Sequence, residues 1–224
     1  MIVFAHEDVR WHRRYSWGMG RRLLKWGRPP TLCIREVSRS IAFRPLRTRH
    51  DRHADWSTRA GGYRQCDIEA RALVGPRVFL GARWGVWAFE SLNEANTYYW
   101  KEEGVGRGIS MQLFCIRDKL RELNEVPVPP RLFEAHPEMI FWRIAGRVLE
   151  SKKTQQGRDE RRRLLEKNGI REIGRWLEQR QRTGIRSDDL IDACACALAA
   201  RDSTDTVPPG GGLTDRGVRA EIWY

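Results

Sequence analysis

Apolar residues recur at helical spacing in several segments of the second part of the chain, and they alternate at strand spacing in only a few. Helices are predicted for residues 68–74, for a segment capped by Ser91 that runs to about residue 102, and for residues 109–125, 155–165, 170–182 and 187–200. The best strand signal lies within residues 131–142, and residues 218–224 alternate as a closing strand. Helices that alternate with a few strands predict an α/β class.

The first sixty residues do not share this pattern. Their apolar positions show no sustained period, and only residues 2–5 and 41–43 suggest a short strand or helix. A disordered basic arm is one interpretation, although four of the ten tryptophans lie here and such arms are usually poor in aromatics. Out-of-frame translation of GC-rich DNA is the other. We therefore predict an atypical basic segment over residues 1–60 and one domain over residues 61–224, with part of its sheet missing.

The net charge of +12 suggests nucleic acid as a partner. Its distribution weakens that suggestion for the predicted domain. Residues 1–60 carry 14 Lys and Arg against 5 Asp and Glu, whereas the remaining residues are close to balance, with 27 against 24. The basic excess thus belongs mainly to the atypical segment.

Cysteine usage and hydropathy predict a reduced, cytoplasmic protein. The five cysteines are an odd number without a CxxC pair, which favours free thiols over a disulfide framework. Cys194 and Cys196 stand two residues apart on a predicted helix, so their side chains face different ways. This favours small buried thiols over metal ligands. No apolar run approaches the ~20 residues that span a bilayer, and no secretory signal opens the chain. The cysteines are Cys33, Cys66, Cys115, Cys194 and Cys196.

Carboxylates cluster at the start of the helix that opens at Ser187. We expect Ser187 to cap it, and Asp188 and Asp189 to lie at the positive end of its dipole. These two could equally be metal ligands. Asp192 lies one turn further in, on the face it shares with them, where capping does not explain it. Asp192 is therefore the best candidate ligand for a divalent cation.

An ordered set of motifs over residues 61–224 resembles a bacterial and archaeal family of unknown function, number 429, described as a predicted RNase H-like nuclease. The main pieces are GYRQCDIEAR at 62–71, RVF at 77–79, GIS at 108–110, FEAHPE at 133–138, SKKT at 151–154, DDLIDA at 188–193, RGVR at 216–219 and EIWY at 221–224. Gly157, Arg158, Glu160 and Arg161 continue the match after SKKT. Each piece is weak alone, but their order and spacing are fairly specific.

This resemblance implies an RNase H-like mixed sheet with flanking helices. Family members begin with two strands that bear acidic residues, and these N-terminal strands are missing or replaced here. Asp55 stands near the expected second acid, in a context that does not match. For Cys66 and Asp67, which do match, the sequence gives no role.

The resemblance also implies metal-dependent hydrolysis of phosphodiesters. Such enzymes hold two Mg²⁺ or Mn²⁺ ions about 3.5–4 Å apart with carboxylate oxygens. The expected metal ligands are Asp192, Asp189 and Asp188. The expected catalytic residues are Asp192, Asp189, Glu134 and His136, and the expected phosphate contacts are Lys152, Lys153 and Arg158.

Each of these roles has a plainer alternative. Glu134 and His136 fit equally well as hydrogen-bonded structural residues, and the lysines fit a solvated turn. Three functions follow for the whole chain: a nuclease of RNase H-like type, impaired by its atypical start; a non-catalytic nucleic-acid-binding module; or a truncated gene product. The sequence does not distinguish DNA, RNA and hybrid substrates or give the oligomeric state.

Overall fold

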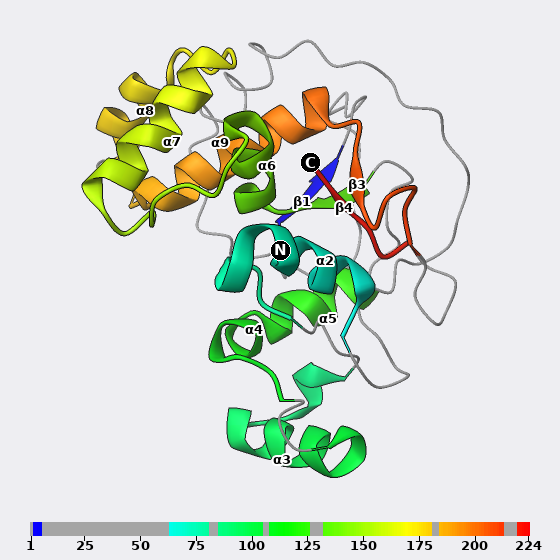
Figure 1. Ribbon diagram of the computed structural model, residues 1–224. Coiled ribbons are helices and arrows are strands. Elements are labelled where there is room, and N and C mark those ends of the chain that lie inside the picture. Colours follow the sequence, from blue (N-terminus) through cyan, green and yellow to red (C-terminus); the bar gives the residue numbers. More distant parts are fainter. Residues whose placement is uncertain are drawn as a thin grey trace, which may run out of the picture.

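The computed structural model describes residues 63–80, 85–104, 108–125, 132–180, 184–212 and 219–224, together with the backbone of residues 2–5. The predictions for residues 41–43, for Asp55 and for Cys33 lie outside these ranges, as does most of the atypical segment. Within them the mixed α/β class is confirmed (Figure 1).

A small mixed sheet lies at the centre of the described structure. Its strands are β1 (Ile2–Ala5), β2 (Leu132–Ala135), β3 (Thr206–Val207) and β4 (Ile222–Trp223), in the order β1-β2-β4-β3. β2 and β4 are parallel, and the other two pairings are antiparallel. The sheet therefore includes a strand from the first sixty residues, where we had expected the N-terminal strands to be missing or replaced.

The described ranges contain eight α-helices besides the sheet, and Figure 1 shows α7 and α8 beyond α9 at one end and α3, α4 and α5 at the other. α2 packs against β3, β4 and α6, while α9 packs against α6, α7, α8 and β1. The helices are α2 (Gln65–Val74), α3 (Leu92–Glu103), α4 (Met111–Cys115), α5 (Arg117–Glu125), α6 (Pro137–Ala145), α7 (Gln155–Lys167), α8 (Ile173–Gln179) and α9 (Ser187–Asp202), with 3₁₀ turns η1 (Gly75–Arg77) and η2 (Val86–Ala88).

Several predicted boundaries are wrong by a few residues. α2 begins at Gln65 instead of residue 68, and α8 begins at Ile173 instead of residue 170. The helix predicted over residues 109–125 is divided at Ile116 into α4 and α5. The capping box that begins at Ser91 is confirmed, because its side chain accepts a hydrogen bond from the backbone N–H of Glu94.

The strand signal over residues 131–142 was only partly right. The strand ends at Ala135, and α6 begins two residues later, so Glu138 lies in the first turn of a helix and not on a strand. His136 is the N-cap and Pro137 occupies the first helical position, where its missing N–H costs nothing. The apolar run that follows is the buried face of α6.

The prediction that Ser187 caps α9 is wrong. Arg186 is the N-cap residue and makes no side-chain capping bond, so Ser187 is already helical. Asp188 and Asp189 do lie in the first turn, as the dipole interpretation requires. Arg186 also lies beside Asp188, with Nε 3.3 Å from Oδ1.

The apolar interior of the described residues forms three clusters. The largest joins α6, α7, α8 and α9, a second lies between α2 and the sheet, and a third holds α3, α4 and α5 together. Cys194 and Cys196 are buried free thiols in the first cluster, as predicted, and Cys66 is buried in the second. Cys115 is exposed.

Candidate functional site

Asp192 forms an ion pair with Lys152 across the gap between α9 and the turn that precedes α7. Lys152 Nζ donates to Asp192 Oδ2 over 2.7 Å, and the side chains are 40% and 14% exposed. The other oxygen, Oδ1, is buried and has no hydrogen-bond partner. Burial raises the pKa of Asp192, with smaller contributions from the negative charges of Glu138 and Asp188, although Lys152 opposes the shift.

The turn that carries Lys152 is held by several hydrogen bonds. Thr154 caps α7 by accepting from the backbone N–H of Gly157, and its hydroxyl donates to the carbonyl of Ser151. The Arg158 guanidinium donates to the backbone carbonyl of Lys153 over 2.7 Å. A Cβ at Gly157 would lie only 2.1 Å from the Ser151 carbonyl oxygen, so this contact requires glycine.

His136 lies at the point where β2 gives way to α6. Its Nδ1 accepts the backbone N–H of Glu138 over 3.2 Å, so the neutral ring carries its proton on Nε2. Burial lowers the pKa of His136 to about 3, and the positive charge of Lys152 acts in the same direction. His136 is therefore a neutral group at physiological pH and a hydrogen-bond donor through Nε2.

Glu138, two residues further on, is bound by a buried arginine. Arg161 Nη2 lies 2.9 Å from each Glu138 carboxylate oxygen, and its Nη1 donates to the backbone carbonyls of Glu150 and Gly157. Arg161 is completely buried. This ion pair ties α6 to α7 and to the turn before α7.

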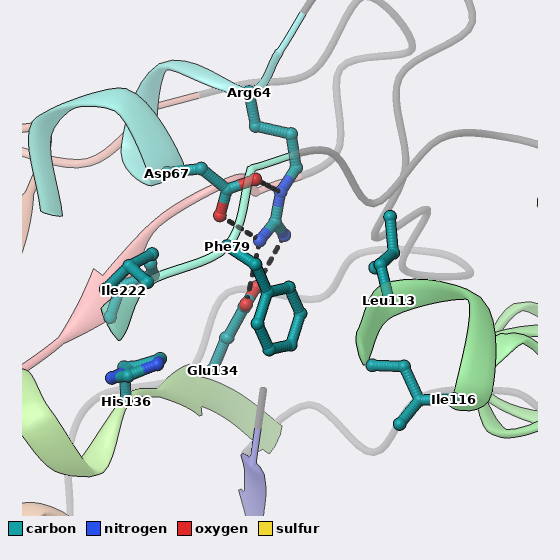
Figure 2. Close-up of a pocket in the computed structure, with 9 residues that line it drawn as sticks. Arg64, Asp67, Phe79, Leu113, Ile116, Glu134, His136 and Ile222 are labelled. Atoms are coloured by element: carbon teal, nitrogen blue, oxygen red, sulfur yellow. Dashed lines mark hydrogen bonds and ion pairs between the residues drawn. The ribbon is translucent and has the colours of Figure 1, made fainter. Parts of the chain in front are cut away.

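A second buried arginine binds two carboxylates at once (Figure 2). Arg64 Nε and Nη2 donate to the oxygens of Asp67 over 2.9 and 2.5 Å, and Nη1 and Nη2 donate to those of Glu134 over 2.7 and 2.9 Å. All three residues are at most 4% exposed. This Arg64 clamp joins the start of α2 to β2, and it gives Asp67 the role that the sequence alone did not reveal.

A small pocket lies beside the Arg64 clamp. Its walls include His136 and Ile222 on one side and Leu113 and Ile116 on the other (Figure 2). The volume is about 20 Å³, room for about one water molecule. A nucleotide does not fit in this pocket.

Comparison with known proteins places the chain in a family. The sequence profile of the family described as "Protein of unknown function (DUF429)" matches residues 45–210, well over half of the chain. The chain belongs to this family. The match covers the Arg64 clamp, the Lys152 turn and Asp192, and it begins within the segment that we predicted to be atypical. No curated protein and no solved structure matches the chain.

The described residues of this family member do not fit a two-metal centre. They contain no group of three or more His, Cys, Asp or Glu side chains placed to hold a metal ion. Asp189 is exposed, Asp188 lies beside Arg186, and both oxygens of Glu134 face the Arg64 guanidinium. Asp192 differs from these residues in that its buried Oδ1 has no hydrogen-bond partner among the described residues.

The three expected phosphate contacts, Lys152, Lys153 and Arg158, differ in their exposure and in their partners within the chain. The Lys152 ammonium is engaged with Asp192 but 40% exposed, and the Arg158 guanidinium is used within its own turn. Lys153 is exposed next to them. Two lysines of one rigid turn are thus accessible to an anion.

Sequence reasoning missed Arg64 and Arg161 as site residues. Both stand in motifs that match the family, and each lies close in sequence to a carboxylate or a glycine of the same motif. The carboxylate of Glu138 lies 23 positions from Arg161, and that of Glu134 lies 70 positions from Arg64. These two long-range ion pairs could therefore not be predicted from the sequence.

Proposed function

We propose that this family member binds the phosphodiester backbone of nucleic acids and hydrolyses it as an RNase H-like nuclease, with Asp192 as the central carboxylate. The observation that supports this most directly is the Lys152–Asp192 pair. It brings a partly exposed cation together with a carboxylate that has one unpaired oxygen.

The residues of the site suit acid–base chemistry on a phosphodiester. The raised pKa of Asp192 makes its carboxylate a better proton acceptor for an attacking water than an ordinary aspartate. The Lys152 ammonium would bind a non-bridging phosphate oxygen. The neutral His136 would donate a hydrogen bond to the substrate through its Nε2–H. Mg²⁺ or Mn²⁺, which the family resemblance implies, stays a prediction for this chain.

The RNase H-like fold is part of the same proposal. It is supported by the mixed sheet in which β2 and β4 are parallel neighbours and by the acidic helix start of α9 nearby. None of the helices in the described ranges has the length and apolar character of a membrane-spanning segment.

Cleavage assays on single-stranded DNA, RNA and a DNA–RNA hybrid test the proposal, each run with Mg²⁺, with Mn²⁺ and with EDTA. We expect Asp192→Asn to abolish cleavage of whichever substrate is cut. Asp202→Asn, at the exposed end of the same helix, is the matched control and should leave the rate unchanged. Cleavage that survives Asp192→Asn at the wild-type rate would remove Asp192 from the proposed site.

Non-catalytic nucleic-acid binding is the second candidate function. It is favoured by one specific observation: Asp67, Glu134, Glu138 and Asp192 each face a cation of the chain itself. In that case an oligonucleotide binds with strong salt dependence and is never cut in any of the metal conditions. Turnover under any of them excludes this second function.

A further inference from the structure

Arg161 connects the turn that carries Lys152 to the start of α6. Its Nη2 donates to both carboxylate oxygens of Glu138 over 2.9 Å. Its Nη1 donates to the backbone carbonyls of Glu150 over 2.7 Å and of Gly157 over 2.9 Å. These two carbonyls lie on either side of the turn. One buried guanidinium therefore closes the turn and binds it to α6.

The bonds within the turn determine its shape, whereas the bonds of Arg161 determine where it lies. The Thr154 hydroxyl bonds to the backbone at both ends of the turn. The carboxylate of Glu138, in contrast, belongs to α6, and α6 packs against α9, which carries Asp192. A series of contacts through Arg161 thus connects Lys152 with Asp192.

The Lys152–Asp192 pair is too weak to position the turn by itself. One hydrogen bond of 2.7 Å joins the two residues, and the flexible lysine side chain is 40% exposed. An ion pair that solvent reaches contributes little to stability. Breaking the buried pair of Arg161 and Glu138 is strongly destabilising, because it leaves an uncompensated charge in the interior. The buried pair therefore positions the exposed one.

We propose that Arg161 is a positioning residue, which holds the turn where the Lys152 ammonium reaches both Asp192 and a nucleic-acid phosphate. This inference rests on the proposed function for the phosphate alone, because the place of Lys152 can be measured without any nucleic acid. The Arg64 clamp is buried as well, but its bonds to carboxylates join α2 to β2. Changes at Arg161 should therefore affect Lys152, and equivalent changes at Arg64 should not.

The first test follows the Lys152 ammonium by proton–nitrogen NMR in the free protein. Lys152→Met assigns its signal, and Asp192→Asn should remove it. Arg161→Lys keeps the charge but not the planar fork that reaches the carboxylate and both carbonyls, so it should also remove the signal. Arg64→Lys, the same change in the other buried site, is the matched control and should keep it. A signal that survives Arg161→Lys, or is absent from the wild type, overturns the proposal.

A second variant decides the matter if Arg161→Lys does not fold. Glu138→Met combined with Arg161→Met replaces the buried pair with uncharged side chains, an exchange that is often neutral for stability. The carbonyls of Glu150 and Gly157 then lose the guanidinium. The Lys152 signal should therefore disappear from a protein that urea denaturation shows to be folded. A folded double variant that keeps the signal refutes the positioning role.

The second test measures the phosphate contact, with a labelled oligothymidylate in EDTA. Each phosphate contact that a single strand loses lowers the slope of log affinity against log salt by about 0.7. Lys152→Met should show this fall and bind about threefold more weakly at low salt. Arg161→Lys should show the same fall although it leaves the net charge unchanged, and combining the two changes should add nothing further.

Loss of stability alone does not alter the salt slope, so Arg64→Lys should keep the wild-type value. An unchanged slope for Arg161→Lys, or effects of Arg161→Lys and Lys152→Met that add, would contradict the proposal. A wild type that binds no oligothymidylate refutes the proposed function, while the NMR signal still decides whether Arg161 positions Lys152.

Discussion

At the scale of the residue, the buried carboxylates of Asp67, Glu134 and Glu138 are satisfied by arginines that each serve more than one acceptor. The Arg64 guanidinium faces two carboxylates, and Arg161 combines a carboxylate with two backbone carbonyls. Because a buried carboxylate without its cation is costly, each arginine fixes the elements that carry its partners. The carboxylates paired with Arg64 and Arg161 therefore stabilise the fold, whereas in a nuclease such carboxylates would take part in catalysis.

Arg64→Met tests this view of the clamp. The change leaves Asp67 and Glu134 buried side by side without a cation, and we expect the free energy of unfolding to fall by about 3–5 kcal/mol. Urea denaturation at neutral pH measures it. Arg175→Met on α8 is the control, since that side chain is 50% exposed and its ion pair with Glu172 is worth at most about 1 kcal/mol. Equal losses in the two variants would show that the clamp is not a major source of stability.

His136 predicts a pH dependence of stability. Its pKa is lowered to about 3 in the folded chain, against about 6.5 in the unfolded chain, so the unfolded chain binds more protons between these values. Stability from this group is therefore complete above about pH 6.5 and is lost as the pH falls toward 3, by on the order of 2–4 kcal/mol.

His136→Asn isolates that contribution, because asparagine can still cap α6 but does not titrate. Urea denaturation at pH 7, 5 and 4 should show a smaller loss of stability for the variant than for wild type over this range. Parallel curves for the two proteins would mean that the imidazole is not held neutral by the fold.

Whether a side-chain contact could be predicted depended on how far apart in the sequence its two residues lie. The bond between Ser91 and Glu94 follows from a local pattern and was predicted, whereas Ser187 was assigned a capping bond that it does not make. The chain turns one residue earlier there, and no side chain caps the helix. Lys152 was singled out for its charge alone, since nothing in the sequence shows that it reaches Asp192.

At the scale of the element, close backbone contacts position the site. The start of α7 approaches the turn that carries Lys152 so closely that only glycine fits at position 157. Elements of this kind were well predicted as helices, because helical period and capping are local properties. The predicted strand extended into α6 because buried helices and buried strands are both rich in apolar residues. In the sequence, the boundary between β2 and α6 is marked by His136 and Pro137, which form the start of the helix.

Gly157→Ala should disturb this contact. The new Cβ would lie 2.1 Å from the Ser151 carbonyl oxygen, so the turn must shift, and we expect a loss of about 1–3 kcal/mol in the free energy of unfolding. Gly174→Ala on α8 is the matched control. Its Cβ meets nothing closer than 3.8 Å, and the helix propensity of alanine should stabilise the protein by up to about 1 kcal/mol. Thermal denaturation compares the two variants, and a neutral Gly157→Ala would contradict the tight approach.

At the scale of the whole molecule, long-range pairing brings the site together. β2 and β4 are neighbours although almost ninety residues separate them, and Lys152 and Asp192 are 40 residues apart. Periodicity predicted the α/β class and most helices, but pairings of this range are set by packing among the three apolar clusters. The strand at residues 2–5 shows the same limit: its flanks carry no strand pattern, and its place in the sheet comes from its pairing with β2.

The comparison of cleavage rates between wild type, Asp192→Asn and Asp202→Asn tests the central claim, that nucleic-acid phosphodiesters are hydrolysed at Asp192. We predict that Asp192→Asn lowers the initial rate on the best substrate by at least about 100-fold, the range in which a positioned acid–base group contributes, while Asp202→Asn stays within about twofold of wild type. An Asp192→Asn protein that folds and cleaves at the wild-type rate would contradict the claim.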